Sequence, residues 1–269
     1  MSPYKLKKLK TLLKNMRSVL VAYSGGMDST FLLKVAHDVL GPGALAVTAV
    51  SPTYPPDELA CARQTAKQFK ARHRVMYTDE LKDKRFAANP ANRCYFCKKE
   101  LFSKLIRMAR KNRLNFVVDA SNCSDAADIR PGNKAKQELG IRSPLIEAGF
   151  TKEDIRAASK RLRLSTWDKP SLACLASRIP YGTKVSEPLL LRVYRAESFI
   201  RRLGFKQVRV RHYGSLCRIE VFKKDIPLLI GRRNLIVERL RKLGYNYVTV
   251  DLEGYRTGSM NLTSRIKRG

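Results

Sequence analysis

The sequence predicts an α/β fold in which a doubly wound parallel sheet is followed by a smaller C-terminal α+β domain. Short apolar runs alternate with stretches of helical spacing along the first two thirds of the chain, which is typical of βαβ units. The apolar run at 19–23 is joined to the next helical stretch by a glycine-containing turn. Beyond residue 189, the order of helical and strand-like stretches indicates a separate, smaller sheet.

The first part of the chain contains the elements of the large sheet. Apolar residues recur at helical spacing from Leu6 to Met16 and predict a helix over 3–17. Strands are expected at 19–23, 44–50, 73–78, 116–119 and 142–146. Helices are expected after residue 30, at 57–70, after residue 97 and at 151–163. The last of these helices opens with Thr151 and Asp154 at the spacing of a capping box.

Residues 165–182 lack a regular period and contain the only tryptophan, Trp167, followed by Pro180 and Gly182. We interpret this stretch as an irregular loop at a domain boundary. The predicted organisation is an α/β domain at 1–170, a site loop and linker at 171–188, and a small α+β domain at 189–269. In the small domain we expect helices at 189–203 and 225–243 and strands at 205–210, 217–222 and 247–252.

The turn after the first strand has the residue types of a polyphosphate site. Gly25 and Gly26 let the backbone approach a phosphate closely, and the following helix N-terminus presents N–H groups to it. Ser24 and Ser29 add hydroxyl donors, whereas the carboxylate of Asp28 is suited to hold Mg²⁺. A tight turn with ordinary capping residues is the alternative explanation.

This turn resembles the PP-loop signature of the ATP-pyrophosphatase superfamily, and the resemblance implies a Rossmann-like sheet. It also implies that ATP is cleaved between its α and β phosphates, with Mg²⁺ bound and pyrophosphate released. The Gly-x₄-Gly-Lys-Ser/Thr pattern of a Walker loop, whose lysine serves the γ-phosphate, does not occur at this turn. Kinase chemistry is therefore not expected. The loops at 51–56 and 120–133 should meet the turn at one edge of the sheet.

Six cysteines stand at positions 61, 94, 97, 123, 174 and 217, and we expect reduced thiols because no secretory signal is recognisable. Cys94 and Cys97 have the two-residue spacing at which both thiolates face one metal or cluster. Cys174 lies in the irregular loop, and three thiolates would leave one iron of a [4Fe–4S] cluster without a protein ligand. Three unrelated thiols, or a zinc site completed by Cys123, explain the same spacing.

Five further stretches are distinctive enough to compare with known families: Asn92–Lys98, Asp128–Gly132, Trp167–Pro170, Ala173–Thr183 and Asp251–Arg256. They resemble the LarE family of ATP-dependent sulfur transferases, which build the nickel-pincer cofactor of lactate racemase. Members either give up the sulfur of one cysteine, which becomes dehydroalanine, or hold a [4Fe–4S] cluster that carries exchangeable sulfide. The resemblance implies the cluster-bearing kind here, with Cys94, Cys97 and Cys174 as ligands. Sacrificial donation from Cys174 is the alternative.

The resemblance also implies a reaction and its participants. ATP would adenylate the carboxylates of pyridinium biscarboxylic acid mononucleotide, and sulfide would then displace AMP to give thiocarboxylates. The implied catalytic residues are Cys174, Asp28, Arg178 and Glu197. Further residues near the nucleotide would be Asn122, Asp128 and Arg130.

Two arginines in the small domain suggest an anion site. Arg209 and Arg211 alternate with Val208 and Val210, which on a strand places both guanidinium groups on one face. Arginine binds phosphate bidentately, so we predict that this pair holds the phosphate of the substrate. A solvated strand face explains the residues equally well, and the LarE resemblance favours the phosphate site.

The chain contains 54 Lys and Arg against 23 Asp and Glu, which gives a net charge of +31. Such a field attracts anions, and we favour a small nucleotide-like substrate together with a sulfide donor. Because RNA is also an anion, a tRNA thiolase of the PP-loop and [4Fe–4S] type is the runner-up, followed by a non-catalytic RNA binder. No apolar run of about 18 residues occurs, so we expect no membrane span and no membrane partner. We also expect a cytoplasmic protein that forms a homo-oligomer.

Overall fold

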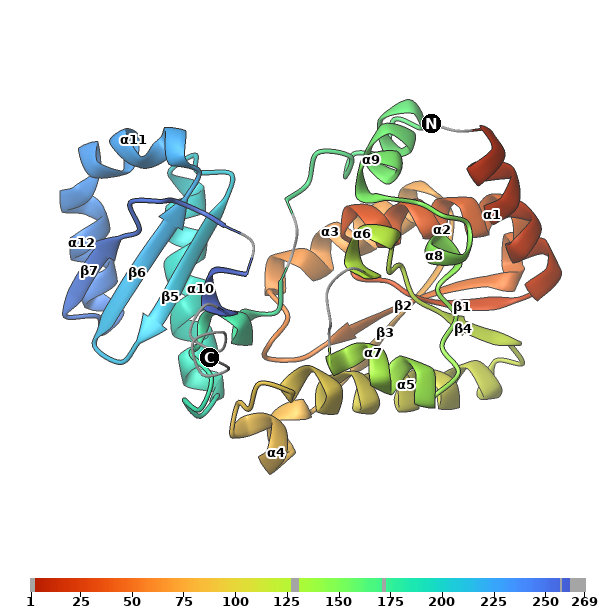
Figure 1. Cartoon of the computed structure of the whole chain (residues 1–269), viewed down its shortest axis with the longest axis horizontal. Coiled ribbons are helices and arrows are strands. Elements are labelled where there is room, and N and C mark those ends of the chain that lie inside the picture. Colours follow the sequence, from red (N-terminus) through yellow and green to blue (C-terminus); the bar gives the residue numbers. More distant parts are fainter. Residues whose placement is uncertain (1–2, 127–130, 171–172, 257, 262–269) are drawn as a thin grey trace, which may run out of the picture. The chain divides into compact units, whose positions relative to one another are not determined.

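The computed structural model describes residues 3–126, 131–170, 173–256 and 258–261, and the chain forms two compact units (Figure 1). The N-terminal unit comprises Met1–Asp83 and Asn92–Leu172. The C-terminal unit comprises Lys84–Ala91 and Ala173–Gly269. The segment at 84–91, with the short helix α4 (Lys84–Ala87), therefore belongs to the C-terminal unit, although the chain around it belongs to the other.

The sheet of the N-terminal unit is parallel throughout, as predicted. Its strands are β1 (Val19–Ala22), β2 (Ala44–Val50), β3 (Arg72–Tyr77) and β4 (Phe116–Val118), in the order β3-β2-β1-β4. β1 pairs with both β2 and β4, so the direction of chain progression reverses beside β1. Ligands of open α/β sheets bind at such a reversal, and the predicted phosphate turn follows β1 directly.

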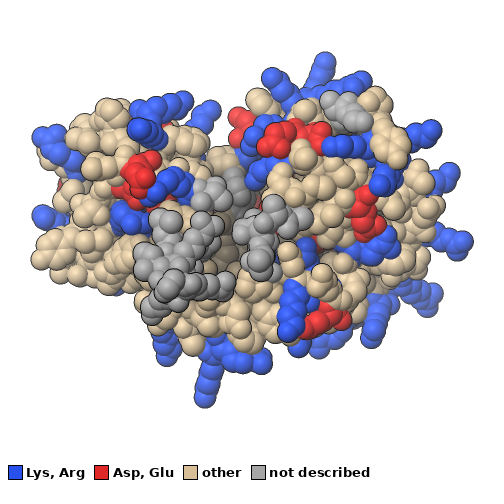
Figure 2. Space-filling view, in the orientation of Figure 1, with Lys and Arg blue, Asp and Glu red and all other residues tan. Residues whose placement is uncertain are grey.

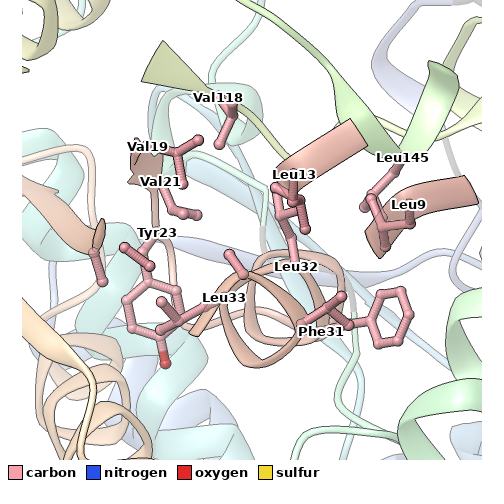
Figure 3. Packing of buried hydrophobic residues seen from close by; sticks show 14 of the residues in the cluster. Leu9, Leu13, Val19, Val21, Tyr23, Phe31, Leu32, Leu33, Val118 and Leu145 are labelled. Atoms are coloured by element: carbon pink, nitrogen blue, oxygen red, sulfur yellow. The ribbon is translucent and has the colours of Figure 1, made fainter. Parts of the chain in front are cut away.

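Helices cover both faces of this sheet, which confirms the doubly wound fold. Val19 and Val21 of β1 pack against α1 (Pro3–Met16) and α2 (Met27–Leu40), with side chains such as Leu13 and Leu32 (Figure 3). Leu20 points the other way, into a cluster with Phe102 and Leu105 of α5 (Arg93–Lys111). The alternation of strand side chains builds both layers, and each fully buried aliphatic side chain contributes about 1.5–3 kcal/mol.

The described part of the N-terminal unit also contains the helices α3 (Pro56–Gln68), α6 (Cys123–Ala126), α7 (Pro131–Glu138), α8 (Pro144–Glu147) and α9 (Lys152–Arg161). Short 3-10 helices occur at Gly41–Gly43 and Glu80–Lys82. The predicted capping box is present at the start of α9, where Thr151 and Asp154 bond each other's backbone N–H groups.

The strand predicted at 142–146 is wrong. Only Arg142 pairs with the sheet, through a single bridge to Val118, and the chain then enters α8 at Pro144. Proline has no N–H group to donate to a strand ladder, and its fixed φ suits the first turn of a helix. The apolar run that suggested a strand instead buries Leu145 against α1.

The C-terminal unit has a mixed three-stranded sheet. Its elements are α10 (Glu187–Arg202), β5 (Val208–Tyr213), β6 (Leu216–Val221), α11 (Ile226–Gly231), α12 (Arg233–Lys242) and β7 (Tyr247–Val250). β5 and β6 are antiparallel, whereas β6 and β7 are parallel. Further 3-10 helices lie at Leu175–Arg178, Lys223–Asp225 and Ser259–Asn261. The helix predicted over 225–243 is divided at Arg232, and β5 begins three residues later than predicted.

The excess of lysine and arginine in the sequence is visible on the surface of the protein. On the face shown in Figure 2, lysine and arginine side chains are spread over both units and do not form one patch. No helix within the described ranges is both long and apolar enough to cross a membrane.

Candidate active site

The phosphate loop, residues 24–26, connects β1 to α2 with a backbone that requires glycine. Gly25 has φ +69°, and a Cβ atom there would lie 2.8 Å from the Cβ of Ala62. The Ser24 N–H donates to the hydroxyl of Ser29 at 3.2 Å, and this hydroxyl donates to the carbonyl of Gly26 at 3.2 Å. These bonds hold the loop against the first turn of α2.

A pocket of about 220 Å³ opens at this loop. Four of the predicted residues line it: Ser24, Gly26, Asp28 and Ser29. Asp119 and Ser121, which follow β4, line the neighbouring wall. Three lysines that the sequence reasoning did not single out also reach the pocket: Lys98, Lys152 and Lys169. The pocket therefore combines carboxylates for a cation with ammonium groups and backbone N–H groups for an anion.

Asp28 has the features of a cation ligand. Its Oδ1 atom is buried and has no hydrogen-bond partner in the described part of the chain. Burial raises the pKa of Asp28, Lys152 acts in the opposite direction, and Asp125 adds to the increase. A buried carboxylate oxygen without a partner is costly, and a hard divalent cation such as Mg²⁺ would satisfy it.

Lys169 is the most informative residue that the sequence reasoning missed. Its ammonium group donates to the carbonyl of Gly25 at 3.1 Å, to Glu58 at 2.6 Å and to the sulfur of Cys61 at 3.3 Å. It belongs to the Trp-Asp-Lys-Pro stretch, which the sequence analysis assigned to a loop at the domain boundary. The sequence signal that could have identified Lys169 is its position as a basic residue within this distinctive stretch.

The polar wall beyond β4 is internally bonded. Lys136 donates to Asp119 at 3.0 Å and to Ser121 at 2.7 Å. Burial acts to raise the pKa of Asp119, but Lys136 and the hydroxyls of Ser143 and Ser121 hold it below its ordinary value. This carboxylate is therefore ionised and neutralised by Lys136 at neutral pH.

Of the three residues after β4 that were predicted to lie near the nucleotide, the structure describes only Asn122. Asn122 is fully buried, and its Oδ1 accepts from the N–H groups of Ser124 and Asp125 at 3.0 and 3.3 Å. It therefore shapes the start of α6 and is not among the described residues that line the pocket. Asp128 and Arg130 lie outside the described residues.

The three predicted cluster ligands divide between the two units. Cys94 and Cys97 lie in the first turns of α5, at the i, i+3 spacing that places them on one face of the helix. Cys174 is exposed and immediately precedes the 3-10 helix of the C-terminal unit. Within the described ranges, no group of three or more His, Cys, Asp or Glu side chains is assembled around a metal position.

Arg178 and Glu197 form a buried ion pair in the C-terminal unit. Nε and Nη2 of Arg178 donate to the two carboxylate oxygens of Glu197 at 2.8 and 3.0 Å. Burial acts to raise the pKa of Glu197, but the charge and hydrogen bonds of Arg178, together with the charges of Arg209 and Arg201, lower this pKa below its ordinary value. The remaining Nη1 of Arg178 donates to the carbonyls of Ala173 and Cys174 at 2.7 and 3.0 Å. The pair therefore fixes the backbone that presents the Cys174 thiol.

The strand alternation of the two predicted phosphate arginines is observed. Val208 and Val210 enter the core, whereas Arg209 and Arg211 point to the opposite face and are each only 5% exposed. Arg211 makes a bidentate pair with Glu220, with its Nε 3.0 Å and its Nη2 2.6 Å from the two carboxylate oxygens. The alternative of a solvated strand face is thus excluded for these two arginines.

Arg209 lies in a more positive environment than Arg211. Its guanidinium group stacks over the ring of Tyr255 at 5.4 Å. Burial, followed by the positive charge of Arg178, lowers the pKa of Arg209 to about 10. Tyr255 is brought there by Gly254, which has φ +71° and where a Cβ atom would lie 2.8 Å from the carbonyl oxygen of Val221. An anion would relieve this accumulation of positive charge.

Three proteins are similar to this chain over nearly its whole length. Pyridinium-3,5-bisthiocarboxylic acid mononucleotide synthase of Lactiplantibacillus plantarum is 38% identical over 252 residues, which are 93% of this chain and 91% of that protein. This chain belongs to the LarE family. An uncharacterised protein of Synechocystis is 44% identical over 96% of this chain and 97% of its own, and one of Methanocaldococcus jannaschii is 30% identical over 94% and 98%. No family model matches the chain.

Four of the five stretches that carry the LarE resemblance coincide with site features of the two units, and most of the fifth, Asp128–Gly132, lies outside the described residues. Asn92–Lys98 opens α5 and supplies Lys98 to the pocket. Trp167–Pro170 supplies Lys169. Ala173–Thr183 contains Cys174 and the buried Arg178, and Asp251–Arg256 brings Tyr255 onto Arg209.

Proposed function

We propose that this LarE-family chain is an ATP-dependent sulfur transferase that converts the carboxylates of pyridinium biscarboxylic acid mononucleotide into thiocarboxylates. The main support is the pocket at the phosphate loop, where Asp28 offers a buried carboxylate oxygen beside a glycine turn and three lysines. The name of the Lactiplantibacillus relative agrees with this product.

The first half-reaction is adenylation. Oxide is a poor leaving group, so a carboxylate must be activated before sulfur can replace its oxygen. Attack of the carboxylate oxygen on the α-phosphate of ATP forms an acyl adenylate and releases pyrophosphate. The N–H groups of Gly25 and Gly26 and the hydroxyl of Ser24 would bind the departing pyrophosphate, and Lys169 would add positive charge. Mg²⁺, held by Asp28, would neutralise charge that develops on the phosphates.

The second half-reaction is sulfur transfer, in which sulfide attacks the acyl carbon and AMP leaves. Cys94, Cys97 and Cys174 would hold a [4Fe–4S] cluster, and their soft thiolates and the helical pair at Cys94 and Cys97 fit such a group. The cluster would supply exchangeable sulfide at an iron without a protein ligand. Arg178 and Glu197 would serve this step as positioning residues, because they fix the backbone at Cys174.

The substrate's phosphate would bind in the C-terminal unit. Arg209 is the better candidate for direct contact, because the positive charge of Arg178 beside it helps to lower its pKa to about 10, and a bound anion would offset that charge. Arg211 already pairs with Glu220 and also donates to the Ser259 hydroxyl at 2.9 Å. It would therefore orient the strand and add to the positive potential of the site.

The decisive experiment is anaerobic purification followed by iron and sulfide analysis, product analysis and protein mass measurement before and after turnover. We expect AMP and pyrophosphate as products, together with iron and sulfide in the wild type. Cys94→Ala, Cys97→Ala and Cys174→Ala should each lose the cluster and sulfur transfer but retain adenylation. Cys123→Ala is the matched control and should keep both.

Three results would contradict parts of the proposal. Formation of ADP would exclude adenylation. Full sulfur transfer by Cys94→Ala, with Cys174 losing the mass of one H₂S in the wild type, would establish sacrificial donation in place of the cluster. Tight, steeply salt-dependent binding of tRNA with thiolation of that tRNA would favour the tRNA thiolase instead.

A further inference from the structure

Besides the bond from Ser29 to Gly26, two donors from distant segments bond backbone carbonyls of the phosphate loop. The hydroxyl of Tyr54 donates to the carbonyl oxygen of Ser24 at 3.0 Å. The ammonium group of Lys169 donates to the carbonyl oxygen of Gly25 at 3.1 Å. Tyr54 belongs to the loop after β2, and Lys169 follows α9, so both bonds join the phosphate loop to distant segments of the same unit.

These two bonds determine where the loop's N–H groups point. A trans peptide group is planar, and its C=O and N–H bonds point in opposite directions. Fixing the carbonyl of Ser24 therefore fixes the N–H of Gly25, and fixing the carbonyl of Gly25 fixes the N–H of Gly26. The back of the loop packs on Ala62 of α3, whereas Ser24 and Gly26 line the pocket.

Without such bonds this loop would have a second conformation available. Glycine accepts φ of either sign, so the peptide group between Ser24 and Gly25 can rotate at little steric cost. The rotated loop would direct a carbonyl oxygen toward a phosphate, and two negative oxygens repel each other. The hydrogen-bond donor to the carbonyl oxygen therefore decides whether the N–H group or the carbonyl group of this peptide faces the pocket.

The donors are themselves firmly placed. Ser51 and Thr53, on either side of the turn before Tyr54, donate to the same oxygen of the buried Glu80 at 2.5 and 2.6 Å. Lys169 is paired with Glu58 of α3 at 2.6 Å. Burial, and then the charge of Glu58, raises the pKa of Tyr54, so its hydroxyl remains a proton donor.

We infer that Tyr54 and Lys169 are positioning residues of the pyrophosphate site, which hold the loop's N–H groups toward the pocket. This role rests on the proposed ATP chemistry. It adds Tyr54 to the residues that serve this chemistry, although Tyr54 is not among the described residues that line the pocket. Lys169 also lines the pocket, and its substitution would remove positive charge from the pocket as well as the bond to Gly25, so Tyr54 provides the cleaner test.

The test is calorimetric titration of the full chain with magnesium pyrophosphate and, separately, with AMP. Tyr54→Phe removes only the hydroxyl and should weaken pyrophosphate binding about 3- to 10-fold, the equivalent of one hydrogen bond, with AMP binding unchanged. Tyr23→Phe is the matched control, because it removes a hydroxyl that donates to the Ala62 carbonyl at 3.3 Å and not to the loop. It should leave both affinities unchanged.

Each other outcome overturns the inference. Unchanged pyrophosphate affinity in Tyr54→Phe would show that the loop does not need the bond from Tyr54. Equal weakening of AMP and pyrophosphate, or the same loss in Tyr23→Phe, would indicate a general packing effect. A wild type that binds neither AMP nor pyrophosphate would overturn the proposed function as well, which separates the two failures.

Discussion

The buried pair of Arg178 and Glu197 gives the strongest quantitative prediction for the C-terminal unit. Glu197→Gln keeps the shape of the side chain but removes its charge and replaces one accepting oxygen with a donating NH₂ group. The wild-type carboxylate accepts from Arg178, from Arg201 at 3.2 Å and from the N–H of Val210 at 3.0 Å. The variant leaves the guanidinium of Arg178 buried without a counter-charge.

Removing one partner of a buried ion pair costs about 3–5 kcal/mol, because the other charge remains desolvated. For a unit of this size, each kcal/mol lowers the melting temperature by about 4–8 °C, so a decrease of at least about 12 °C is expected. Urea denaturation followed by circular dichroism measures the free energy of unfolding. Amide hydrogen exchange at Val210 should also accelerate, because this N–H loses its carboxylate acceptor.

Two controls distinguish this mechanism from a general loss of charge. Glu238→Gln makes the same chemical change in an exposed i, i+4 pair with Lys242 and should leave stability unaltered. The double variant Arg178→Met/Glu197→Met removes both charges and should recover much of the loss. A free energy of unfolding for Glu197→Gln within about 1 kcal/mol of the wild type would refute the reasoning.

Two further predictions concern the phosphate loop and pH. Gly25→Ala should lower the free energy of unfolding by about 2–5 kcal/mol, because the new side chain is strained at a left-handed φ and overlaps with Ala62, and it should abolish pyrophosphate binding. Gly140→Ala is the control: it has φ +63° but lies in open space, so it should lower the free energy of unfolding by only about 1–2 kcal/mol. The second prediction concerns His212, whose pKa in the folded protein is lowered by burial and by the charge of Arg192. In the unfolded chain this histidine has a pKa of about 6.5, so near and below that pH the unfolded chain binds more protons than the folded protein does. Stability should therefore fall as pH decreases through 6.5, and urea titrations should show a smaller fall in His212→Phe; an identical pH dependence would exclude His212 as a source.

Local patterns in the sequence were sufficient for four strands of the large sheet and for the glycine turn that follows β1. The apolar run of β1, the glycines that follow it and the capping box at Thr151 each act over a few residues, so spacing alone identifies them. The same local signal failed at 142–146, where Pro144 directs the chain into α8. An apolar run indicates burial, but it does not by itself distinguish a strand from a helix.

The partners of the charged residues were decided only by the tertiary structure. Lys169 reaches Gly25 across 144 positions, and Arg178 meets Glu197 across 19. Arg211 is bound by Glu220, which lies across the β5–β6 hairpin. Sequence spacing identifies residue types on one strand or one helix, whereas a buried charge must find its counter-charge wherever the packed chain places one. The sequence by itself therefore determined the sheet and the phosphate loop, and the folded chain decided which side chains hold that loop and the backbone at Cys174.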